Sequence, residues 1–308
     1  MTQVETSPPH LPELPLDSTP SASPGPATAT GTPPTFFTRT KRYRDAGVVV
    51  PASILVLIVL ACFFGPTVFS LPDATTGDLS EGLLPIGSPG HPLGTNALGN
   101  DMLAQLLVGG RVTLTVAFGA IAIGMIVGSL IGMLAAFYQR VLGPVLMRCL
   151  DVIFAFPDIV LAIAIASYLG PSMFNAIIAI GFFSIAGFGR ITRAQTLRVV
   201  HMDYVVAART SGVPMLQILT THVWPNVAGR VFAYGLVAIA GAMMAEAALS
   251  FLGLGVPAPT PSWGSIIGQN QSYMTVAPQL IVMPAIMLFA TIASVNLLSD
   301  ALQEKRAS

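Results

Sequence analysis

The chain has 308 residues, of which 53% are hydrophobic and only 9% are charged. A soluble domain carries about 25% charged residues, so this composition excludes an ordinary water-soluble protein and predicts one that crosses a membrane several times. Its 14 Lys and Arg residues balance 14 Asp and Glu residues, and their distribution along the chain is therefore more informative than their sum.

The N-terminal segment, residues 1–38, is rich in Pro, Thr and Ser and has no apolar run. Such a segment buries too little apolar surface to fold, so we expect a disordered cytoplasmic tail. A secretory signal peptide has a basic start followed at once by an apolar core, and this N-terminus has neither. The first span is therefore expected to be retained.

Six apolar segments follow, and each is predicted to form a membrane-spanning helix. A helix needs about 20 apolar residues to cross the bilayer, because in lipid its backbone groups must be hydrogen-bonded internally. The predicted fold class is therefore an all-α, polytopic membrane protein. The predicted spans are residues 48–69, 113–137, 145–169, 174–190, 229–254 and 278–299.

The basic residues predict the orientation of these spans in the cell membrane, because Lys and Arg are retained on the cytoplasmic side. Arg39, Lys41, Arg42 and Arg44 directly precede the first span. They place the N-terminus in the cytoplasm, and six crossings return the C-terminus to the same side. Arg111 is the one basic residue that this topology places outside. The remaining basic residues, in or beside predicted cytoplasmic segments, are Arg140, Arg148, Arg190, Arg193, Arg198, Arg209, Arg230, Lys305 and Arg306.

Two longer segments are predicted to lie on the outer side. The first ends in a predicted interfacial helix, capped by Asn100, that leads into the second span. The second, residues 256–278, contains Trp263 and Tyr273, which favour the membrane–water boundary, and we expect it to cover the outer end of a cavity. After the tail, the predicted organisation is a basic flank and first span at 39–70, an outer loop at 71–111, and a core of five helices at 112–303.

The cytoplasmic loop at residues 191–228 contains the stretch DYVVAARTSGVPMLQILTTHVWPN, residues 203–226, which is too polar to span a membrane. We predict two short helices. The first ends at Gly212, which readily adopts the left-handed conformation, and Pro214 suits the first turn of the second. Pro225 is expected to close the second helix near residues 221–223. The apolar face of the second helix is predicted to consist of Met215, Leu216, Ile218 and Leu219.

The spacing of this stretch resembles the cytoplasmic coupling loop of ABC importer permeases. The pattern of that family is Glu-Ala-Ala, three residues, Gly, nine residues and Ile-x-Leu-Pro; here Val206 stands in place of Glu, and His222 and Trp224 in place of Ile and Leu. The dipeptide, oligopeptide and nickel branch is closer, since Tyr-Val-x-Ala-Ala-Arg, a later His and Pro-Asn are usual there. This chain matches that branch at Tyr204, Val205, Ala207, Ala208, Arg209, His222, Pro225 and Asn226.

Further matches to this branch cover about residues 90–300. The run from Glu246 to Gly264 is the most specific of them. The departures are Asn96 and Asn100, where Asp and Arg are common, and a C-terminus without the usual glycine-flanked aspartate. An outer-loop signature is matched by His91, Leu93, Gly94, Thr95, Leu98, Gly99 and Asp101.

The resemblance implies a C-type permease subunit, with type I importer architecture, of an ATP-driven importer for dipeptides or oligopeptides. Its implied partners are a homologous B-type permease subunit that completes the pore, two ABC ATPase subunits or domains, an extracytoplasmic substrate-binding protein and the peptide substrate, with no nucleic acid. The stretch at 203–226 would transmit force from the ATPases to the spans. The residues predicted to act in this coupling are Asp203, Tyr204, Ala207, Ala208, Arg209, Gly212, Pro214, His222, Pro225 and Asn226.

No cofactor is predicted to bind to the chain itself, and no catalytic residue is predicted. A P-loop needs a lysine after its glycines, and the only lysines are Lys41 and Lys305, in the tails, so ATP and Mg²⁺ are expected on the partner ATPases. His201 and His222 have no carboxylate or cysteine at ligand spacing, which argues against a metal site. The two cysteines, Cys62 and Cys149, are interpreted as buried small hydrophobic residues and not as a disulfide.

Two acidic residues in predicted spans are candidates for the translocation pathway or its gate, because an ionisable group within the bilayer is unfavourable unless it is paired or hydrated. Asp158 follows Pro157 in the third span and would contact a peptide amino terminus or a bound water, or else pair across the pore interface. Glu246, in the fifth span, would line the pathway or a gate, or else bond to a neighbouring loop or to the partner permease. Asp151 is expected to pair with Arg148, three residues earlier.

The second span carries a glycine stripe. Gly124, Gly128 and Gly132 repeat every four residues and give the helix a smooth face against which another helix can pack closely. That face would serve either static packing or the sliding of one helix along another.

Three alternatives differ in what they require of the sequence. Nickel or another small solute is a possible cargo within the same family. A secondary transporter without an ATPase would usually show inverted repeats and discontinuous spans, and no repeat between the two halves is found. An intramembrane enzyme would need a motif such as His-Glu-x-x-His or Gly-x-Ser-x-Gly, and the sequence has neither.

Overall fold

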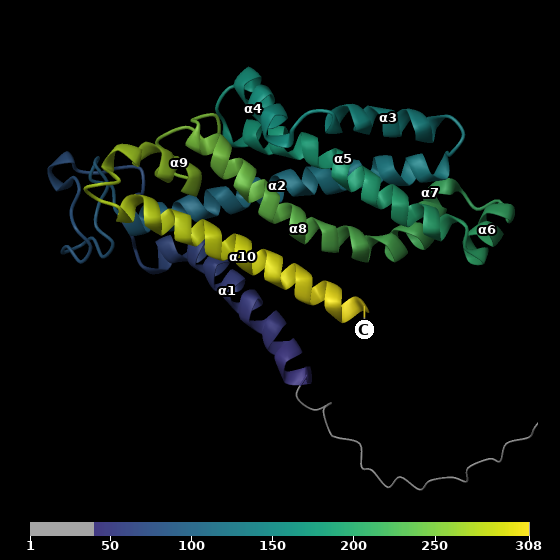
Figure 1. Cartoon of the computed structure of the whole chain (residues 1–308), viewed down its shortest axis with the longest axis horizontal. Helices are drawn as coiled ribbons and strands as arrows, with labels where there is room; N and C mark the ends of the chain where they lie inside the picture. The colour runs from purple at the N-terminus through teal and green to yellow at the C-terminus, as the bar shows by residue number, and fades with distance from the viewer. Residues whose placement is uncertain (1–39, 308) are drawn as a thin grey trace, which may run out of the picture. The chain divides into compact units, whose positions relative to one another are not determined.

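The structure is a computed structural model that describes residues 40–307, and these residues form helices and connecting loops without a β-strand. The predicted tail at 1–38 and Arg39 lie outside the described residues, as do the side chains of Lys41, Arg42, Arg44, Lys305 and Arg306. The helices in chain order (Figure 1) are α1 (Thr40–Val68), α2 (Met102–Phe137), α3 (Leu142–Phe154), α4 (Asp158–Leu169), α5 (Met173–Val200), α6 (Asp203–Thr210), α7 (Met215–Gln217), α8 (Trp224–Phe251), α9 (Trp263–Gln269) and α10 (Gln279–Ala307).

The described helices include five stretches that are long and apolar enough to cross a membrane, and a sixth if α3 and α4 count as one span bent by 86°. The all-α membrane fold is therefore confirmed, but the third span, expected at 145–169, is not a straight helix. Pro157 causes the bend, because proline has no N–H for the helix ladder and disfavours helical geometry in the residue before it. The five unbent stretches are Val48–Val68, Met102–Phe137, Met173–Val200, Met215–Phe251 and Gln279–Glu304.

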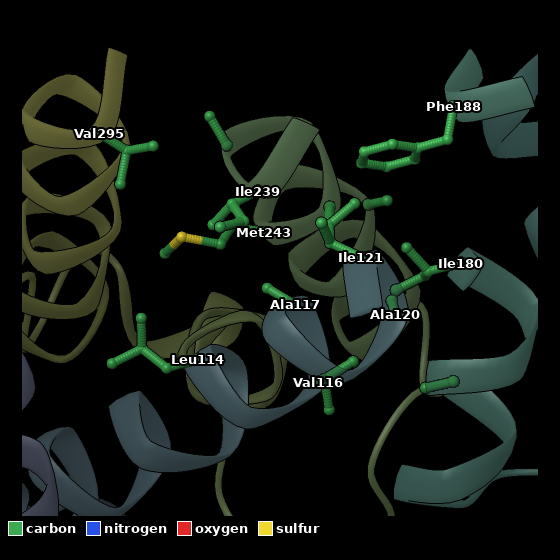
Figure 2. Close-up of a cluster of buried hydrophobic side chains, with 14 of the residues drawn as sticks. Leu114, Val116, Ala117, Ala120, Ile121, Ile180, Phe188, Ile239, Met243 and Val295 are labelled. Carbon is green, nitrogen blue, oxygen red and sulfur yellow. The ribbon is translucent and has the colours of Figure 1, made fainter. Parts of the chain in front are cut away.

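The hydrophobic core lies where α2, α5, α8 and α10 meet, and Figure 2 shows part of it. Lipid tails are as apolar as these side chains, so within a membrane it is their close packing against one another that stabilises the bundle. The labelled core residues come from α2 (Leu114, Val116, Ala117, Ala120 and Ile121), α5 (Ile180 and Phe188), α8 (Ile239 and Met243) and α10 (Val295).

The glycine stripe of α2 lies directly against α5. A Cβ atom added to Gly124 would lie 2.6 Å from Ser184 Cβ, and one added to Gly128 would lie 2.5 Å from the carbonyl oxygen of Ile185. Real Cβ atoms do not approach other atoms so closely, so only glycine permits this helix separation. The predicted close-packing face is therefore confirmed, and its partner is α5.

The start of α2 differs from its prediction. The expected interfacial helix is not a separate element, because α2 runs unbroken from Met102 to Phe137. Its N-cap is Asp101, not Asn100: Asp101 Oδ1 accepts a hydrogen bond from the backbone N–H of Ala104 at 2.7 Å. The N–H of Asn100 instead donates to Asn96 Oδ1 at 3.0 Å. Asn and Asp are equally good caps, so adjacent candidates cannot be separated by residue type.

Arg111, the basic residue that the topology places outside, connects α2 to α1. Pro66 lies inside α1 and lacks the N–H that would bond to the carbonyl of Cys62. Arg111 supplies donors at this point, with Nε 3.3 Å from Cys62 O and Nη2 2.8 Å from Phe63 O. Its guanidinium also lies over the Phe63 ring at 5.8 Å. A cation thus stabilises the helix turn that proline weakens.

Trp263 is fully buried within the protein, so its ring faces neighbouring helices and not lipid or water. Its indole Nε1–H donates to the carbonyl of Leu106 at 2.9 Å, and its backbone N–H donates to Thr113 Oγ1 at 3.2 Å. A buried indole needs such a partner for its N–H, and a carbonyl of α2 provides it. Both cysteines are free, as expected, but only Cys62 is buried; Cys149 is exposed on α3.

Candidate functional site

The residues predicted to couple and those predicted to line the pathway lie in separate places. The segment from α6 to α7 lies at the end of the bundle opposite α9 (Figure 1). Asp158 opens α4 and Glu246 lies within α8. The two sets are joined through α8, which begins beside α6.

The turn after α6 has the geometry that the sequence predicts. Gly212 has a φ of 77°, in the left-handed region. The N–H of Val213 donates to the carbonyl of Ala208 at 3.1 Å and that of Gly212 to Arg209 at 3.2 Å, which closes the helix end. No atom lies within 4 Å of a Cβ built on Gly212, so the backbone angle and not lack of space requires glycine here.

The second short helix does not end at Pro225, contrary to the prediction. Pro214 directly precedes α7, and α7 continues through a π-helical turn at Ile218–Val223 into α8 without a break. The helix from Met215 to Phe251 thus has 37 residues. A π turn takes an extra residue, and this widening lies immediately before Pro225, whose ring would clash in a regular helix. The side chain of Asn226 donates to the carbonyl of His222 in the same turn, at 2.7 Å.

Three of the predicted coupling residues contact one another. The rings of Tyr204 and His222 are stacked, with centroids 6.2 Å apart and planes at 27°. Asn226 Nδ2 donates to the hydroxyl of Tyr204 at 3.2 Å. Val205, next to Tyr204 on α6, is buried. These contacts attach α6 to the π turn and to the start of α8.

The outward face of this segment combines apolar and charged side chains. Leu216 was expected to pack against neighbouring helices, but its side chain is 74% exposed. Ile218 and Leu219 are buried, and Leu216 points the other way because one helix cannot turn four nearly consecutive residues to one side. The other exposed residues of the segment include Met202, Asp203, Val206, Ala207, Arg209, Gly212 and Pro214, whereas Ala208 is half-buried.

Asp158 lines a cavity of about 340 Å³ between α3, α4, α5 and α8. It is the only charged residue among those that line the cavity, and it makes no hydrogen bond or ion pair with the described residues. Its neighbours in the lining are mostly apolar or aromatic, with the hydroxyl groups of Ser184 and Tyr234. The aromatic ones are Phe154, Phe183, Phe188 and Tyr234.

Glu246 is completely buried and does not line this cavity. Ser250 Oγ donates to Glu246 Oε1 at 2.7 Å, whereas Oε2 has no hydrogen-bond partner. The hydroxyls of Thr113 and Ser262 lie near the same carboxyl but outside good hydrogen-bonding geometry. Glu246 therefore lies where α8 meets α2 and the start of α9. Its role in a gate stays a prediction.

Asp151 pairs with Arg190, not with Arg148 as expected. Asp151 Oδ1 lies 2.6 Å from Arg190 Nη2. The guanidinium of Arg190 also lies 4.0 Å from the centre of the Phe154 ring. The pair connects α3 to α5 beside the cavity, and sequence spacing within α3 could not reveal a partner from another helix.

The described residues contain no group of three His, Cys, Asp or Glu side chains arranged to hold a metal ion.

The sequence of this chain matches a known protein family. Residues 128–307 fit the family described as "binding-protein-dependent transport system inner membrane component". This range is more than half of the chain and contains α6, the cavity and Glu246.

The chain belongs to this transport family. As a family member with several apolar helices, it is a multi-pass permease of the cell membrane. The glutathione transport system permease protein GsiD of Pectobacterium atrosepticum is 33% identical to this permease over 268 residues, covering 86% of this chain and 88% of GsiD. The di/tripeptide transport system permease protein DppC of Pseudomonas aeruginosa is 35% identical over 212 residues, covering 69% and 70%.

The fold of this permease is also found among solved structures. An inward-facing conformation of the MetNI methionine ABC transporter matches 65% of this chain and 95% of that chain, with a TM-score of 0.54 and 15% sequence identity. At this identity the similarity concerns the fold. It agrees with the ABC importer architecture expected for this permease.

Proposed function

We propose that this permease is one half of the translocation pore of an ATP-driven peptide importer. A second, homologous permease subunit supplies the other half, and a substrate-binding protein delivers peptide from outside the cell. Membership of the binding-protein-dependent family supports this assembly. Two relatives are a glutathione permease and a di/tripeptide permease, which supports a small peptide as cargo.

The observation that carries the proposal is the attachment of α6 to one long helix. Tyr204, His222 and Asn226 hold α6 against the start of the 37-residue helix that ends at Phe251. At 1.5 Å per residue this helix is about 55 Å long. It runs from the exposed α6 segment to Glu246, beside the start of α9. A push on α6 therefore reaches the opposite end of the bundle through one rigid element.

ATPase subunits are the proposed source of that push. Large exposed apolar side chains at a protein end that faces water mark a contact surface for another protein. Met202, Val206 and Leu216, on or near α6, are exposed apolar side chains of this kind. ATP and Mg²⁺ are bound by the partner ATPases, and α6 receives the movement that follows hydrolysis.

The cavity with Asp158 is the proposed contact point for the peptide. A carboxylate among aromatic rings suits an ammonium group, because carboxylates form charge-assisted hydrogen bonds and rings attract cations. Peptides carry this group at their amino terminus. Nickel is a poorer fit, since it prefers imidazole or thiolate ligands and no His or Cys lines this cavity in the described structure.

The test changes one exposed residue of the α6 segment and a matched one elsewhere. Leu216→Asp places a charge in the proposed ATPase contact, whereas Leu79→Asp changes a residue of equal exposure, 75% against 74%, in the outer loop. The complex is purified through this permease, and uptake of radiolabelled dipeptide is measured in proteoliposomes. We expect Leu216→Asp to lose the co-purified ATPase and about tenfold or more in uptake, and Leu79→Asp to retain both.

Wild-type ATPase binding and uptake in Leu216→Asp would contradict the proposed contact. Peptide uptake by the purified permease without any ATPase would instead favour a secondary transporter.

A further inference from the structure

A basic cavity lies at the foot of α6, apart from the cavity that contains Asp158. It has a volume of about 790 Å³ and lies between the α2–α3 turn and the end of α5 with α6. Arg140 comes from the turn, His201 follows α5, and Arg209 comes from α6. No acidic residue lines the cavity; Asp203, in the first turn of α6, is outside the lining.

The two arginines are not neutralised by carboxylates. In the described side chains, ion pairs are made by His91 and Arg190, and neither Arg140 nor Arg209 takes part in one. The Arg209 guanidinium lies 4.9 Å from the centre of the Phe137 ring, an arrangement that leaves its N–H edge available to an anion. The C-terminal ends of α2 and α5 each offset about half a positive charge through their dipoles, and the two guanidinium groups still leave the cavity positive.

His201 adds a directed polar group. Its Nδ1 lies 2.8 Å from the carbonyl of Leu197, and because a carbonyl only accepts, Nδ1 carries the hydrogen. This bond fixes the ring and leaves Nε2 without a partner of its own. With the hydrogen on Nδ1, Nε2 of the neutral ring is an acceptor, so the donors suited to phosphate oxygens are the two forked guanidinium groups of Arg140 and Arg209.

Beside the arginines, part of the exposed lining of the cavity is apolar or aromatic. Val141, on the α2–α3 turn, is 74% exposed, and Leu142 and Tyr138 beside it are also exposed. A soluble phosphate ion gains nothing from these side chains, whereas a phospholipid can lay its acyl chain along them while its headgroup meets the arginines. The predicted topology places this turn on the cytoplasmic face, whose leaflet carries anionic lipids.

We propose that this cavity binds the phosphate headgroup of an anionic phospholipid. The bound lipid bridges Arg140 at the end of α2 and Arg209 on α6. It therefore steadies the position of α6 relative to the bundle. This last consequence, but not lipid binding itself, rests on the proposed coupling function.

The test measures lipid retention and needs no transport. The intact transporter, purified in mild detergent without ATP, is incubated with phosphatidylglycerol or phosphatidylethanolamine, and bound lipid is counted by native mass spectrometry. We expect preferential binding of phosphatidylglycerol. The variant Arg140→Gln should weaken the binding of phosphatidylglycerol about fivefold. The double variant Arg140→Gln/Arg209→Gln should weaken this binding about 25-fold. The control, Arg148→Gln, removes an exposed arginine of α3 that lies outside the cavity.

Each other outcome overturns the proposal. Equal retention of the two lipids would show that the headgroup charge is not recognised. An equal loss in Arg148→Gln would assign the effect to general surface charge. Displacement of phosphatidylglycerol by millimolar inorganic phosphate would assign the site to a soluble anion. Because binding is measured without ATP, a failure of the proposed importer function leaves this result unaffected.

Discussion

Three prolines within or between the helices of this permease have three different consequences. Pro66 leaves α1 intact, because Arg111 donates to the carbonyls of Cys62 and Phe63. Pro157 separates α3 from α4 with a bend of 86°. Pro225 is accommodated by a π turn that widens the helix just before it. Proline always removes a donor, but the surrounding donors and the local winding decide whether the helix continues.

At Asp158 a single charge is expected to decide which peptides bind well. The variant Asp158→Asn keeps the side-chain shape and removes the negative charge in the cavity. We expect the KM for a dipeptide with a free amino terminus to rise about tenfold, because one charge-assisted hydrogen bond is lost. Uptake by proteoliposomes measures this KM. The control is the N-acetylated form of the same dipeptide, which has no free ammonium group. An equal loss for both peptides would remove Asp158 from ammonium recognition.

His91 is expected to make the outer loop sensitive to pH. Its ring bonds to Asp101 at 2.9 Å and to Glu81 at 3.2 Å. The bond to Asp101 is the largest cause that raises the pKa of His91 above its ordinary value of 6.5. Burial opposes it, and the bond to Glu81 adds a smaller upward effect. A raised pKa in the folded state means that the imidazolium stabilises the loop. This stabilisation is complete below pH 6.5 and is lost as the pH rises through the higher folded value.

Hydrogen exchange of residues 79–101, corrected for its intrinsic pH dependence, measures the effect of His91. Protection should fall above pH 6.5 in the wild type and show no such fall in His91→Gln. The control variant His201→Gln, at the opposite end of the bundle, should behave as the wild type. Identical pH profiles for wild type and His91→Gln would contradict the prediction.

Among the elements, α6 depends on the turn that ends it. The variant Gly212→Val places a β-branched residue at a φ of 77°, which is unfavourable by about 1–3 kcal/mol. Because nothing lies within 4 Å of the new Cβ, the protein should still insert and assemble. We expect ATP-driven peptide uptake to fall several-fold as α6 loses its orientation. The variant Gly212→Asn, which tolerates left-handed geometry, should keep near wild-type uptake, and equal uptake in the two variants would contradict this account.

The sequence predicts the elements better than it predicts their ends. Hydropathy locates every apolar helix, because about 20 apolar residues are needed to cross a bilayer. It does not show that α5 continues to Val200, since the final turns are basic and leave the apolar region. It also misses the unbroken helix from Met215 to Phe251, because the π turn that accommodates Pro225 has no residue signature.

At the candidate site, the sequence predicts which residues belong to the site but not how they contact one another. Spacing and resemblance select Tyr204, His222 and Asn226 as coupling residues, and the Gly212 turn follows from residue type. Their mutual contact depends on the winding of the π turn, which rotates His222 and Asn226 toward α6. Interactions between helices distant in sequence, such as Asp151 with Arg190, need the packed bundle to be seen.

For the whole molecule, the predicted orientation can be tested at its two ends. The α6 segment lies opposite α9, and the C-terminal end of α10 also points away from α9 (Figure 1). In a background with Cys62→Ala and Cys149→Ser, we expect Leu216→Cys to react with a membrane-impermeant maleimide only from the cytoplasmic side. Leu79→Cys should react only from outside. The labelling uses the permease expressed without its ATPases, in which both positions are well exposed, so a reversed pattern would contradict the orientation.

The glycine contact between α2 and α5 restricts how the permease can move. Gly124 and Gly128 let α2 lie directly against the α5 backbone, with no room for a larger side chain between the two helices. We expect the two helices to move together as one unit. We expect the opening and closing of a pathway to involve parts outside this helix pair, above all the bent α3–α4 arm, which carries Asp158 at its bend.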